Sequence, residues 1–266
     1  MKKLKVSTWN INSVRLRLPL VLQFLKDQKP DVLALQETKT LDEFFPGQAL
    51  KDAGYTHQLF TGMKSYNGVA LLSKVPLEKI DTPYWCDKQD CRGISGRLPN
   101  GVEIHNLYIP AGGDIPDRAV NDKFGHKLDF VAEVGKFWKK MKCGKTGRIL
   151  LGDFNIAPLE QDVWSHKQLL DVVSHTPIEV ESLLKMQAAN DWVDAVRHFV
   201  PADQKLYTWW SYRNQDWRKS DRGRRLDHIW VSPNLKNNLK SYHILKDARD
   251  WQQPSDHVPV SVEMKF

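Results

Sequence analysis

RILLGDFN, at residues 148–155, joins a short apolar run to a carboxylate and an amide that stand two residues apart. An apolar run of this kind, bounded by polar residues, is typical of a strand that is buried on both faces. We therefore expect a strand over Arg148–Asp153, with Asp153 and Asn155 projecting from its end toward the same side. Asp and Asn are also favoured turn residues, and when this pattern stands alone it is an ordinary turn more often than a site.

Outward from this strand, short β-like runs alternate with a few helical patterns. Leu18, Leu22 and Leu25 have helical spacing, and the pair Lys29-Pro30 ends that helix. Many strands with few helices predict a large α/β sandwich in which helices cover two packed sheets. The further expected strands are Leu4–Asn10, Val32–Gln36, Gly68–Ser73, Val102–Ile109, Leu226–Val231 and Val258–Met264, and the expected helices are Leu18–Gln28 and Val131–Met141.

Polar side chains that could bind a metal or a phosphate recur at the ends of these strands. Loops at strand ends often carry sites because the sheet holds them rigidly. Each residue also has an ordinary explanation, such as a solvated strand end for Glu37 or a salt bridge for Asp227. The pair Asp256-His257 suits metal ligation or acid–base chemistry, and it equally fits a surface loop. The strand-end set is Asn10, Asn12, Glu37, Tyr108, Asp153, Asn155, Asp256 and His257.

The composition fits one globular domain over residues 1–266. Hydrophobic residues make up 41% of the chain and charged residues 27%, and no repeat or low-complexity linker divides it. Met1–Val6 does not lead into an apolar region as a signal peptide would, and no apolar run approaches the roughly 20 residues that cross a bilayer. Three cysteines without CxxC spacing, Cys86, Cys91 and Cys143, predict reduced thiols. We expect a cytoplasmic protein with no membrane partner.

The formal net charge of +7 favours a polyanionic partner. Basic and aromatic residues are interleaved most densely over Tyr207–Arg225, just before Leu226-Asp227. Lysine and arginine neutralise nucleic-acid phosphates, and aromatic rings can stack on sugars or bases. The alternative is that the tryptophans belong to the core and the charges to a solvated face. The residues concerned are Trp209, Trp210, Tyr212, Arg213, Trp217, Arg218, Lys219, Arg222, Arg224 and Arg225.

Six short motifs occur in one order along the chain, and together they are far more specific than any of them alone. With them the chain resembles the exonuclease/endonuclease/phosphatase superfamily and, within it, the bacterial type of the exonuclease III family of abasic-site endonucleases. The resemblance implies an α/β fold of the DNase I-like kind, a four-layer αββα sandwich with two packed mixed β-sheets flanked by helices. The motifs are WNIN (9–12), LQET (35–38), NLYIP (106–110), GDFN (152–155), RRLDHIW (224–230) and SDHVPV (255–260).

The resemblance implies a metal site with magnesium as the cofactor and manganese as an alternative. Glu37 would be the principal ligand, assisted by Asn10 and Asp256. Mg²⁺ is a hard cation that prefers oxygen ligands and keeps several waters, so a site with few protein carboxylates and an incoming phosphate suits it.

The resemblance also assigns five catalytic residues. Asp153 would be the general base that positions and deprotonates the attacking water, and Asn155 would donate to the phosphate. His257, oriented by Asp227, would stabilise charge on a phosphoryl oxygen, as positioned donors do in phosphoryl transfer. Tyr108 would add a phenolic hydrogen bond to the same phosphate.

Five further residues are implied in substrate binding. Asn12 and Arg92 match phosphate or DNA contacts, and Trp209 and Leu226 match the lining of a pocket for an extrahelical abasic sugar. At the pocket position where the eukaryotic branch of the family has an aromatic residue, this chain has Arg224. This departure leaves the balance between abasic-site cutting and degradation of 3′ ends open.

The function that the resemblance implies is a magnesium-dependent DNA phosphodiesterase of base excision repair. It would act as a monomer on double-stranded DNA, incising 5′ of abasic sites and removing nucleotides or blocking groups from 3′ ends. One alternative is a superfamily phosphatase for phosphoinositides or other small phosphate esters, because fold does not fix function. A second alternative is a DNA-binding module with a degenerate site, which the joint presence of the acidic, amide and imidazole residues above argues against.

Overall fold

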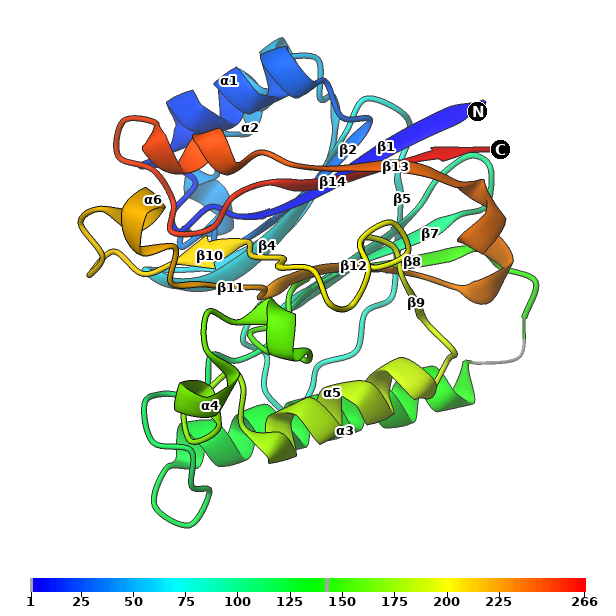
Figure 1. The fold of residues 1–266 in the computed structure, drawn as a ribbon. Helices are drawn as coiled ribbons and strands as arrows, with labels where there is room; N and C mark the ends of the chain where they lie inside the picture. Colours follow the sequence, from blue (N-terminus) through cyan, green and yellow to red (C-terminus); the bar gives the residue numbers. More distant parts are fainter. Residues whose placement is uncertain (1, 142–143) are drawn as a thin grey trace.

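A computed structural model describes residues 2–141 and 144–266, and the Cys143 prediction lies outside these residues. Within them, two six-stranded sheets lie face to face and helices cover both outer faces (Figure 1). The four layers confirm the predicted αββα sandwich. The helices are α1 (Leu18–Gln28), α2 (Gly47–Asp52), α3 (Asp122–Lys140), α4 (His166–Leu169), α5 (Pro177–Ala188) and α6 (Trp217–Ser220), with 3-10 turns at Asp42–Phe44, Glu160–Asp162, Pro233–Asn238 and Lys246–Asp250.

The first sheet has the strand order β13-β14-β1-β2-β4-β3. The pair β1–β2 is parallel and its other pairs are antiparallel, so the sheet is mixed. The first and last strands of the chain are therefore neighbours in its middle. Its strands are β1 (Lys3–Asn10), β2 (Val32–Gln36), β3 (His57–Met63), β4 (Tyr66–Ser73), β13 (Leu239–Ile244) and β14 (Val260–Lys265).

The second sheet has the order β5-β6-β7-β8-β12-β9, with β7–β8 as its parallel pair. Both sheets thus place one parallel pair near the centre. A two-stranded ribbon of β10 (Trp209–Trp210) and β11 (Gly223–Arg224) extends beyond it. The strands of the second sheet are β5 (Glu78–Ile80), β6 (Gly93–Arg97), β7 (Glu103–Tyr108), β8 (Arg148–Asp153), β9 (Val193–Asp194) and β12 (Asp227–Val231).

The period of two along each strand divides its side chains between two cores. Val32 and Ala34 of β2 pack between the sheets, where they meet Ile149 and Leu151 of β8. The intervening Leu33 points outward into the core under α1 and α2. Because both faces of β2 and β8 are buried, these two strands carry continuous apolar runs, which is why the sequence predicted them.

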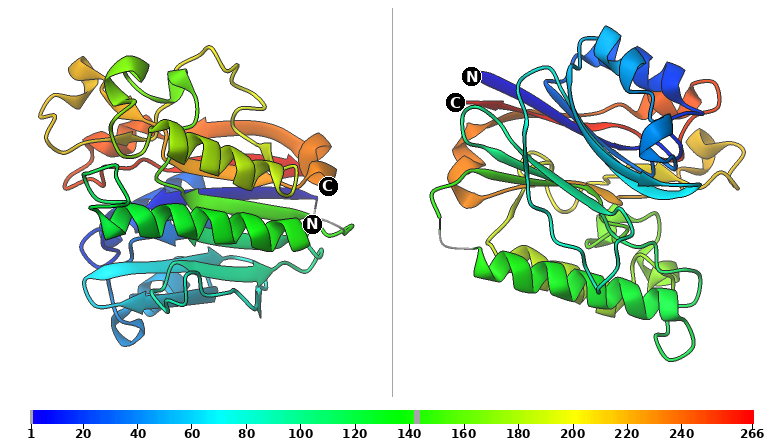
Figure 2. Two further views of the ribbon diagram at one scale, coloured as in Figure 1. Left: turned by 90° about the horizontal axis from the view of Figure 1, so that it is seen from below. Right: turned by 180° about the vertical axis from the view of Figure 1, so that it is seen from behind.

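The opposite outer face is covered by α3 and α5, which lie side by side across the second sheet (Figure 2). Val131, Val134 and Trp138 of α3 pack with Leu150 and Trp230 of the sheet. The predicted helix Val131–Met141 was wrong about its start, since α3 begins at Asp122. Its first turns carry Gly125 and a fully buried lysine, which interrupt the apolar spacing.

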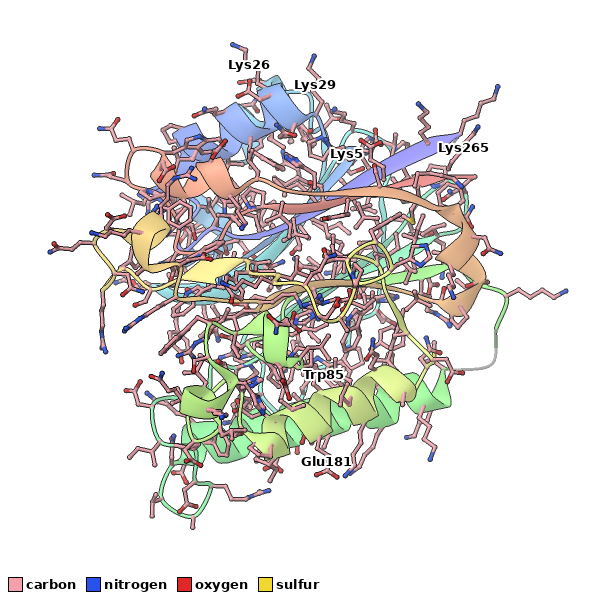
Figure 3. All side chains as sticks on the ribbon, viewed as in Figure 1. Lys5, Lys26, Lys29, Trp85, Glu181 and Lys265 are labelled. Carbon is pink, nitrogen blue, oxygen red and sulfur yellow. The ribbon has the colours of Figure 1, made fainter. Side chains whose placement is uncertain are left out.

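Basic side chains are spread over several surfaces. Lys26 and Lys29 at the end of α1 point into solvent, as does Lys265 beside the chain ends (Figure 3). The net charge is therefore not concentrated in one segment. Within residues 2–141 and 144–266, no helix is long and apolar enough to cross a membrane.

Candidate active site

The ends of four central strands meet at one edge of the sandwich. Asn10 at the end of β1 is in register with Gln36 of β2, so Glu37 follows directly beside it. In the other sheet, Tyr108 at the end of β7 is in register with Asp153 at the end of β8. A hydrogen bond of 2.9 Å from Asn10 Nδ2 to Asp153 Oδ2 joins the two sheets at this edge.

Unusual backbone conformations set the direction of the side chains here. Gly152 has a φ of +142°, and an added Cβ would lie 1.9 Å from the carbonyl oxygen of Leu107. Only glycine therefore allows β8 to approach β7 immediately before Asp153. Glu37 and Asn155 are in the left-handed region, with φ values of 51° and 53°. Non-glycine residues in this region carry strain, and they gather at functional sites.

Glu37 accepts hydrogen bonds on both carboxylate oxygens. Its Oε1 lies 2.8 Å from Asn10 Nδ2 and 2.8 Å from the Tyr108 hydroxyl. Its Oε2 lies 2.7 Å from Lys39 Nζ. Burial alone would raise the pKa of Glu37, but the charge of Lys39 and the Asn10 hydrogen bond lower it below its usual value. Glu37 is thus an anion, with 17% of its side chain exposed.

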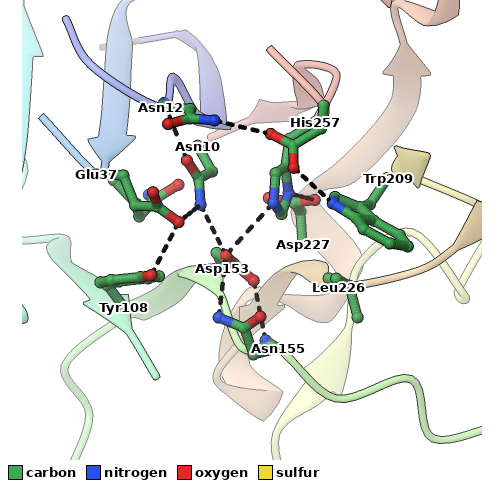
Figure 4. A network of polar contacts seen from close by, with 12 residues as sticks. Asn10, Asn12, Glu37, Tyr108, Asp153, Asn155, Trp209, Leu226, Asp227 and His257 are labelled. Atoms are coloured by element: carbon green, nitrogen blue, oxygen red, sulfur yellow. Dashed lines mark hydrogen bonds and ion pairs between the residues drawn. The ribbon is translucent and has the colours of Figure 1, made fainter. Parts of the chain in front are cut away.

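Asp153 stands at the centre of the polar network (Figure 4). Glu37 and Tyr108 lie on one side of it, and His257 on the other. Its Oδ1 accepts from the Asn155 backbone amide at 2.9 Å, and its Oδ2 lies 3.2 Å from Asn155 Nδ2. Burial raises the pKa of Asp153 to about 7, although the nearby His257 acts in the opposite direction. The carboxyl group can therefore exchange a proton near neutral pH.

His257 is held between two carboxylates. Its Nδ1 lies 2.9 Å from Asp227 Oδ2, and its Nε2 lies 3.7 Å from Asp153 Oδ2. The Thr208 hydroxyl donates to the same Asp227 oxygen at 2.6 Å. Burial alone would lower the pKa of His257, but the charges of Asp227 and Asp153 raise it to about 10. The imidazolium is therefore the stable form at neutral pH.

Two groups of side chains offer ligands to a metal ion. Asp153, Asp227 and His257 have potential ligand atoms within 4.8 Å of one another, but the imidazolium of His257 has no lone pair for a metal and would first have to lose a proton. Asp227 Oδ1 is buried without a hydrogen-bond partner in the described structure. The second group is centred on the Glu37 carboxylate. Asn10 turns its amide nitrogen toward Glu37, so it acts as an oxygen ligand only if the amide rotates. These hard oxygen donors fit a divalent cation such as Mg²⁺.

Asp256 belongs to the rim of the site. Its Oδ2 accepts from Trp209 Nε1 at 2.9 Å, and its Oδ1 lies 3.3 Å from Asn12 Nδ2. Asn12 also accepts from Lys39 Nζ at 2.7 Å through its own side-chain oxygen. The chain of contacts from Glu37 through Lys39 and Asn12 therefore reaches Asp256.

A cavity of about 630 Å³ opens over these residues. It brings together Glu37, Asn155 and His257 with residues of the β10–β11 ribbon and its loops. Of the five predicted substrate residues, Trp209, Arg224 and Leu226 line this cavity. Its wall also includes Ala111, Gly113, Asp114, Trp164, Val172, Val173, Ser174, Ser211, Arg213, Asn214, Arg222 and Asp256.

Arg92 is buried beside Tyr108 and does not line the cavity in the described structure. It is 6% exposed, pairs with Asp90 at 2.5 Å, and places its guanidinium carbon 4.8 Å from the centroid of the Tyr108 ring. These contacts position Tyr108, and a direct contact of Arg92 with substrate stays a prediction.

Part of the predicted basic and aromatic segment is structural. Trp210 and Trp217 are buried in one apolar cluster. Arg225 is 2% exposed and pairs with Asp194 at 2.7 Å. Arg218 forms ion pairs with Asp247 and Asp250. For the two tryptophans the core alternative holds, whereas Arg218 and Arg225 are engaged in ion pairs, and the buried Arg225 does not belong to a solvated face.

Sequence reasoning missed two residues of the site. Lys39 follows the LQET motif directly, and Thr208 directly precedes Trp209. Position next to a motif was the available signal for both, but residue type alone did not show which carboxylate of the site each would contact. Their partners became evident only when the strand ends came together.

Comparisons with known proteins extend along the chain. The model of the Endonuclease/Exonuclease/phosphatase family matches residues 7–257. Exodeoxyribonuclease III of Haemophilus influenzae is 30% identical over 98% of this chain and all of its own length. Two solved structures each cover 99% of this chain and 100% of their own: a 3′ phosphatase from Neisseria bound to a product DNA hairpin, with 31% identity and a TM-score of 0.91, and an AP endonuclease from Archaeoglobus fulgidus, with 30% identity and a TM-score of 0.90. By sequence and by fold, this chain belongs to the Endonuclease/Exonuclease/phosphatase family.

Proposed function

We propose that this protein is a DNA repair phosphodiesterase that incises 5′ of abasic sites and removes nucleotides or blocking groups from 3′ ends of duplex DNA. The observation that carries the proposal is the environment of Asp153, with two amide donors and an imidazolium around one buried carboxyl group. The names of its relatives support the substrate, since they include an exodeoxyribonuclease III, an AP endonuclease and a 3′ phosphatase. The pathway would be base excision repair.

The reaction needs a base, because water must lose a proton as it attacks phosphorus. Asp153 is suited to this role because its pKa of about 7 lets it accept that proton near neutral pH. The carboxamide of Asn155, the imidazolium of His257 and the phenol of Tyr108 would donate to the phosphoryl oxygens as negative charge develops there. Asp227 would hold His257 in place through its Nδ1 atom.

Members of the family depend on a metal, and we propose magnesium for this chain. Glu37 would be the principal ligand, with Asn10 and Asp256 completing the site through their oxygens or through bound water. A divalent cation there would neutralise phosphate charge and stabilise the leaving oxygen. Manganese would be the expected substitute, because it also accepts carboxylate, carbonyl and water ligands.

Duplex DNA would lie across the cavity wall. Arg213, Arg222 and Arg224 line it, and guanidinium groups bind backbone phosphates well. Asn12, Trp209 and Leu226 would contact the nucleotide at the site of cleavage, with Arg92 supporting Tyr108 from below. We propose that the protein acts as a monomer.

The location proposed for the protein is the cytoplasm. The free thiols of Cys86 and Cys91 support this proposal, because thiols stay reduced in that compartment.

The proposal is tested with a duplex that carries a single abasic analogue, incubated with and without Mg²⁺ and analysed for internal incision and for shortening from the 3′ end. Both products should require the metal. A protein that hydrolyses inositol phosphates or other small esters but leaves all duplexes intact would instead be a phosphatase, which is the alternative kept from the sequence. Binding to duplex without hydrolysis would identify a DNA-binding module.

A further inference from the structure

Arg224 is fixed across one wall of the cavity. It pairs with Trp209 in the β10–β11 ribbon, and its guanidinium carbon lies 5.3 Å from the centroid of the Trp209 ring. Its Nη1 donates to the carbonyl oxygen of Val173 at 2.9 Å and to Ser174 Oγ at 2.7 Å. The side chain therefore spans from the ribbon to the loop on the opposite wall.

The loop that anchors Arg224 is itself held by buried charges. Both carboxylate oxygens of Glu179 accept from the Ser174 backbone amide, at 3.0 and 2.9 Å. Glu179 forms an ion pair with Lys127, and both side chains are 0% exposed. Lys127 Nζ also donates to the backbone oxygen of Asn155 at 2.8 Å. One buried pair thus connects the anchor of Arg224 to the catalytic loop.

The charge of Arg224 has no carboxylate partner within ion-pair distance among the described residues. Its Nε atom is buried without a hydrogen-bond partner in that part of the chain. Burial lowers its pKa, an effect that Glu179 opposes, but Glu179 is already paired with Lys127. A partly buried cation without a counter-charge attracts an anionic ligand.

The two proposed kinds of substrate differ in charge at this wall. In an internal phosphodiester, the phosphate oxygen on the downstream side is esterified to the next sugar. In a 3′-terminal phosphate the same oxygen is free and carries additional negative charge. Arg224 lines the same cavity as Asn155 and His257, so a phosphate bound by those residues would lie in the same cavity as the Arg224 guanidinium.

We propose that Arg224 is a specificity-determining residue that favours 3′-terminal phosphates over internal abasic sites. The inference rests on the proposed function and assigns a preference among its substrates. In the favoured reaction, water adds to phosphorus, the bond from phosphorus to O3′ breaks, and O3′ takes up a proton. The products are inorganic phosphate and a 3′-hydroxyl end.

Arg224 would also weaken the binding of an extrahelical sugar without a base. The guanidinium covers a face of Trp209, which is the surface on which an extrahelical sugar would pack. An uncharged sugar cannot replace the electrostatic interaction that the phosphate offers, and it would have to displace a side chain anchored by two hydrogen bonds.

The experiment compares the wild type with Arg224→Leu, which has a similar apolar stem but no charge. The control is Arg118→Gln, because Arg118 is exposed, pairs with Asp129 and lies outside the cavity. Each protein is assayed on three matched duplexes that end in a 3′-phosphate, end in a 3′-hydroxyl, or carry an internal abasic analogue. Inhibition by inorganic phosphate is measured in parallel, and thermal unfolding shows that each variant is folded.

We expect Arg224→Leu to lower kcat/KM for the 3′-phosphate by about tenfold to a hundredfold, the range of one charge-assisted hydrogen bond. Because Arg224 also lines the proposed DNA-binding wall, activity on the abasic duplex can fall as well, but by a smaller factor. The ratio of kcat/KM for the 3′-phosphate to kcat/KM for the abasic duplex should therefore fall, and inhibition by inorganic phosphate should weaken. Arg224→Lys keeps a cation and should recover part of the preference. An equal loss on all three duplexes, or an unchanged ratio, would overturn the inference and leave the nuclease function standing. If the wild type cleaved none of the duplexes, the proposed function itself would fail, and the inference with it.

Discussion

The imidazole Nδ1 of His257 lies 2.9 Å from Oδ2 of Asp227, in a pair that is buried at the junction of the two sheets. The hydroxyl of Thr208 binds the same oxygen, so the carboxylate cannot rotate freely. Asp227 therefore fixes both the charge and the direction of the imidazole, whose Nε2 points to Asp153. The positive charge of His257 therefore depends on Asp227, which does not itself line the cavity.

The first prediction concerns this pair. Asp227→Asn keeps the shape but removes the charge that most strongly raises the pKa of His257 from its buried baseline. The pKa of His257 should fall from about 10, and kcat should drop by about 10²- to 10³-fold, the usual cost of losing one charge-stabilising donor. NMR titration of the imidazole in metal-free protein, together with kcat at saturating DNA, tests both effects. An unchanged imidazole titration would mean that Asp227 does not control the charge.

The second prediction concerns the base. Asp153→Asn should bind abasic duplex with near-normal affinity and lose several orders of magnitude in kcat, because the amide cannot accept the proton of water. In the wild type the reactive form is the carboxylate, so activity should rise as pH increases toward the free-enzyme pKa of about 7. That rising limb should disappear in the residual activity of the variant. Near-normal turnover would refute the assignment.

The third prediction concerns the metal. Glu37→Gln removes the anionic ligand and keeps the side-chain volume, so more Mg²⁺ should be needed for half-maximal activity, by at least about tenfold. Activity should partly recover at high Mg²⁺. The matched control is Glu181→Gln on the exposed face of α5, where Glu181 forms an ion pair with Lys185. Identical Mg²⁺ titrations for wild type and Glu37→Gln would remove Glu37 from the metal site.

The fourth prediction concerns salt dependence. Arg213 and Arg222 line the cavity, whereas Arg218 is engaged by two aspartates. Replacing Arg213 and Arg222 together with alanine should reduce the slope of log Kd against log salt by about two, since each phosphate contact contributes roughly 0.9. Arg218→Ala should change the slope little. The reverse pattern in fluorescence anisotropy would show that the duplex lies over α6 instead.

The fifth prediction concerns stability in acid. His228 donates from Nε2 to the carbonyl oxygen of Ile156 at 2.9 Å, and burial lowers its pKa to about 3. Because the folded pKa lies below the unfolded value of about 6.5, the unfolded chain binds a proton first as pH falls. Stability from neutral His228 is therefore present above pH of about 6.5 and is lost progressively below it.

Between pH 7 and pH 5 this single group should cost about 2 kcal/mol of unfolding free energy. His228→Gln should remove that part of the acid sensitivity, at some cost to packing against Phe154. Urea unfolding at the two pH values measures the difference. If the variant loses as much stability as the wild type between them, His228 is not the group that titrates.

The sequence predicted the centre of the fold better than its edges. Central strands such as β2 and β8 are buried on both faces and read as continuous apolar runs. The edge strands β3 and β13 are half-buried or exposed, so they carry no such run. Helix α5 was missed, although Thr176 and Glu179 form a capping box at its start, which is a recognisable signal.

Motif order pointed to the residues of the candidate site and, through the resemblance, to a role for each, but it did not predict their contacts with neighbouring side chains. Tertiary packing sets the side-chain directions that bring Glu37 to Lys39. It likewise brings Arg224 to Ser174. Arg225, one position further along the chain, is buried in ion pairs. Adjacent arginines thus have opposite surroundings, and no pattern of residue types along the chain separates them.

The pairing of β1 with β14 has a consequence for how the chain acquires activity during synthesis. Leu4 is in register with Met264, so the first sheet cannot be completed until the residues of β14 have left the ribosome. His257 stands just before β14, so a nascent chain that lacks both has neither a closed first sheet nor the imidazole proposed to act in catalysis. Contacts of such long sequence separation slow folding. Activity should therefore appear only after the residues from His257 through β14 have emerged from the ribosome and paired with β1.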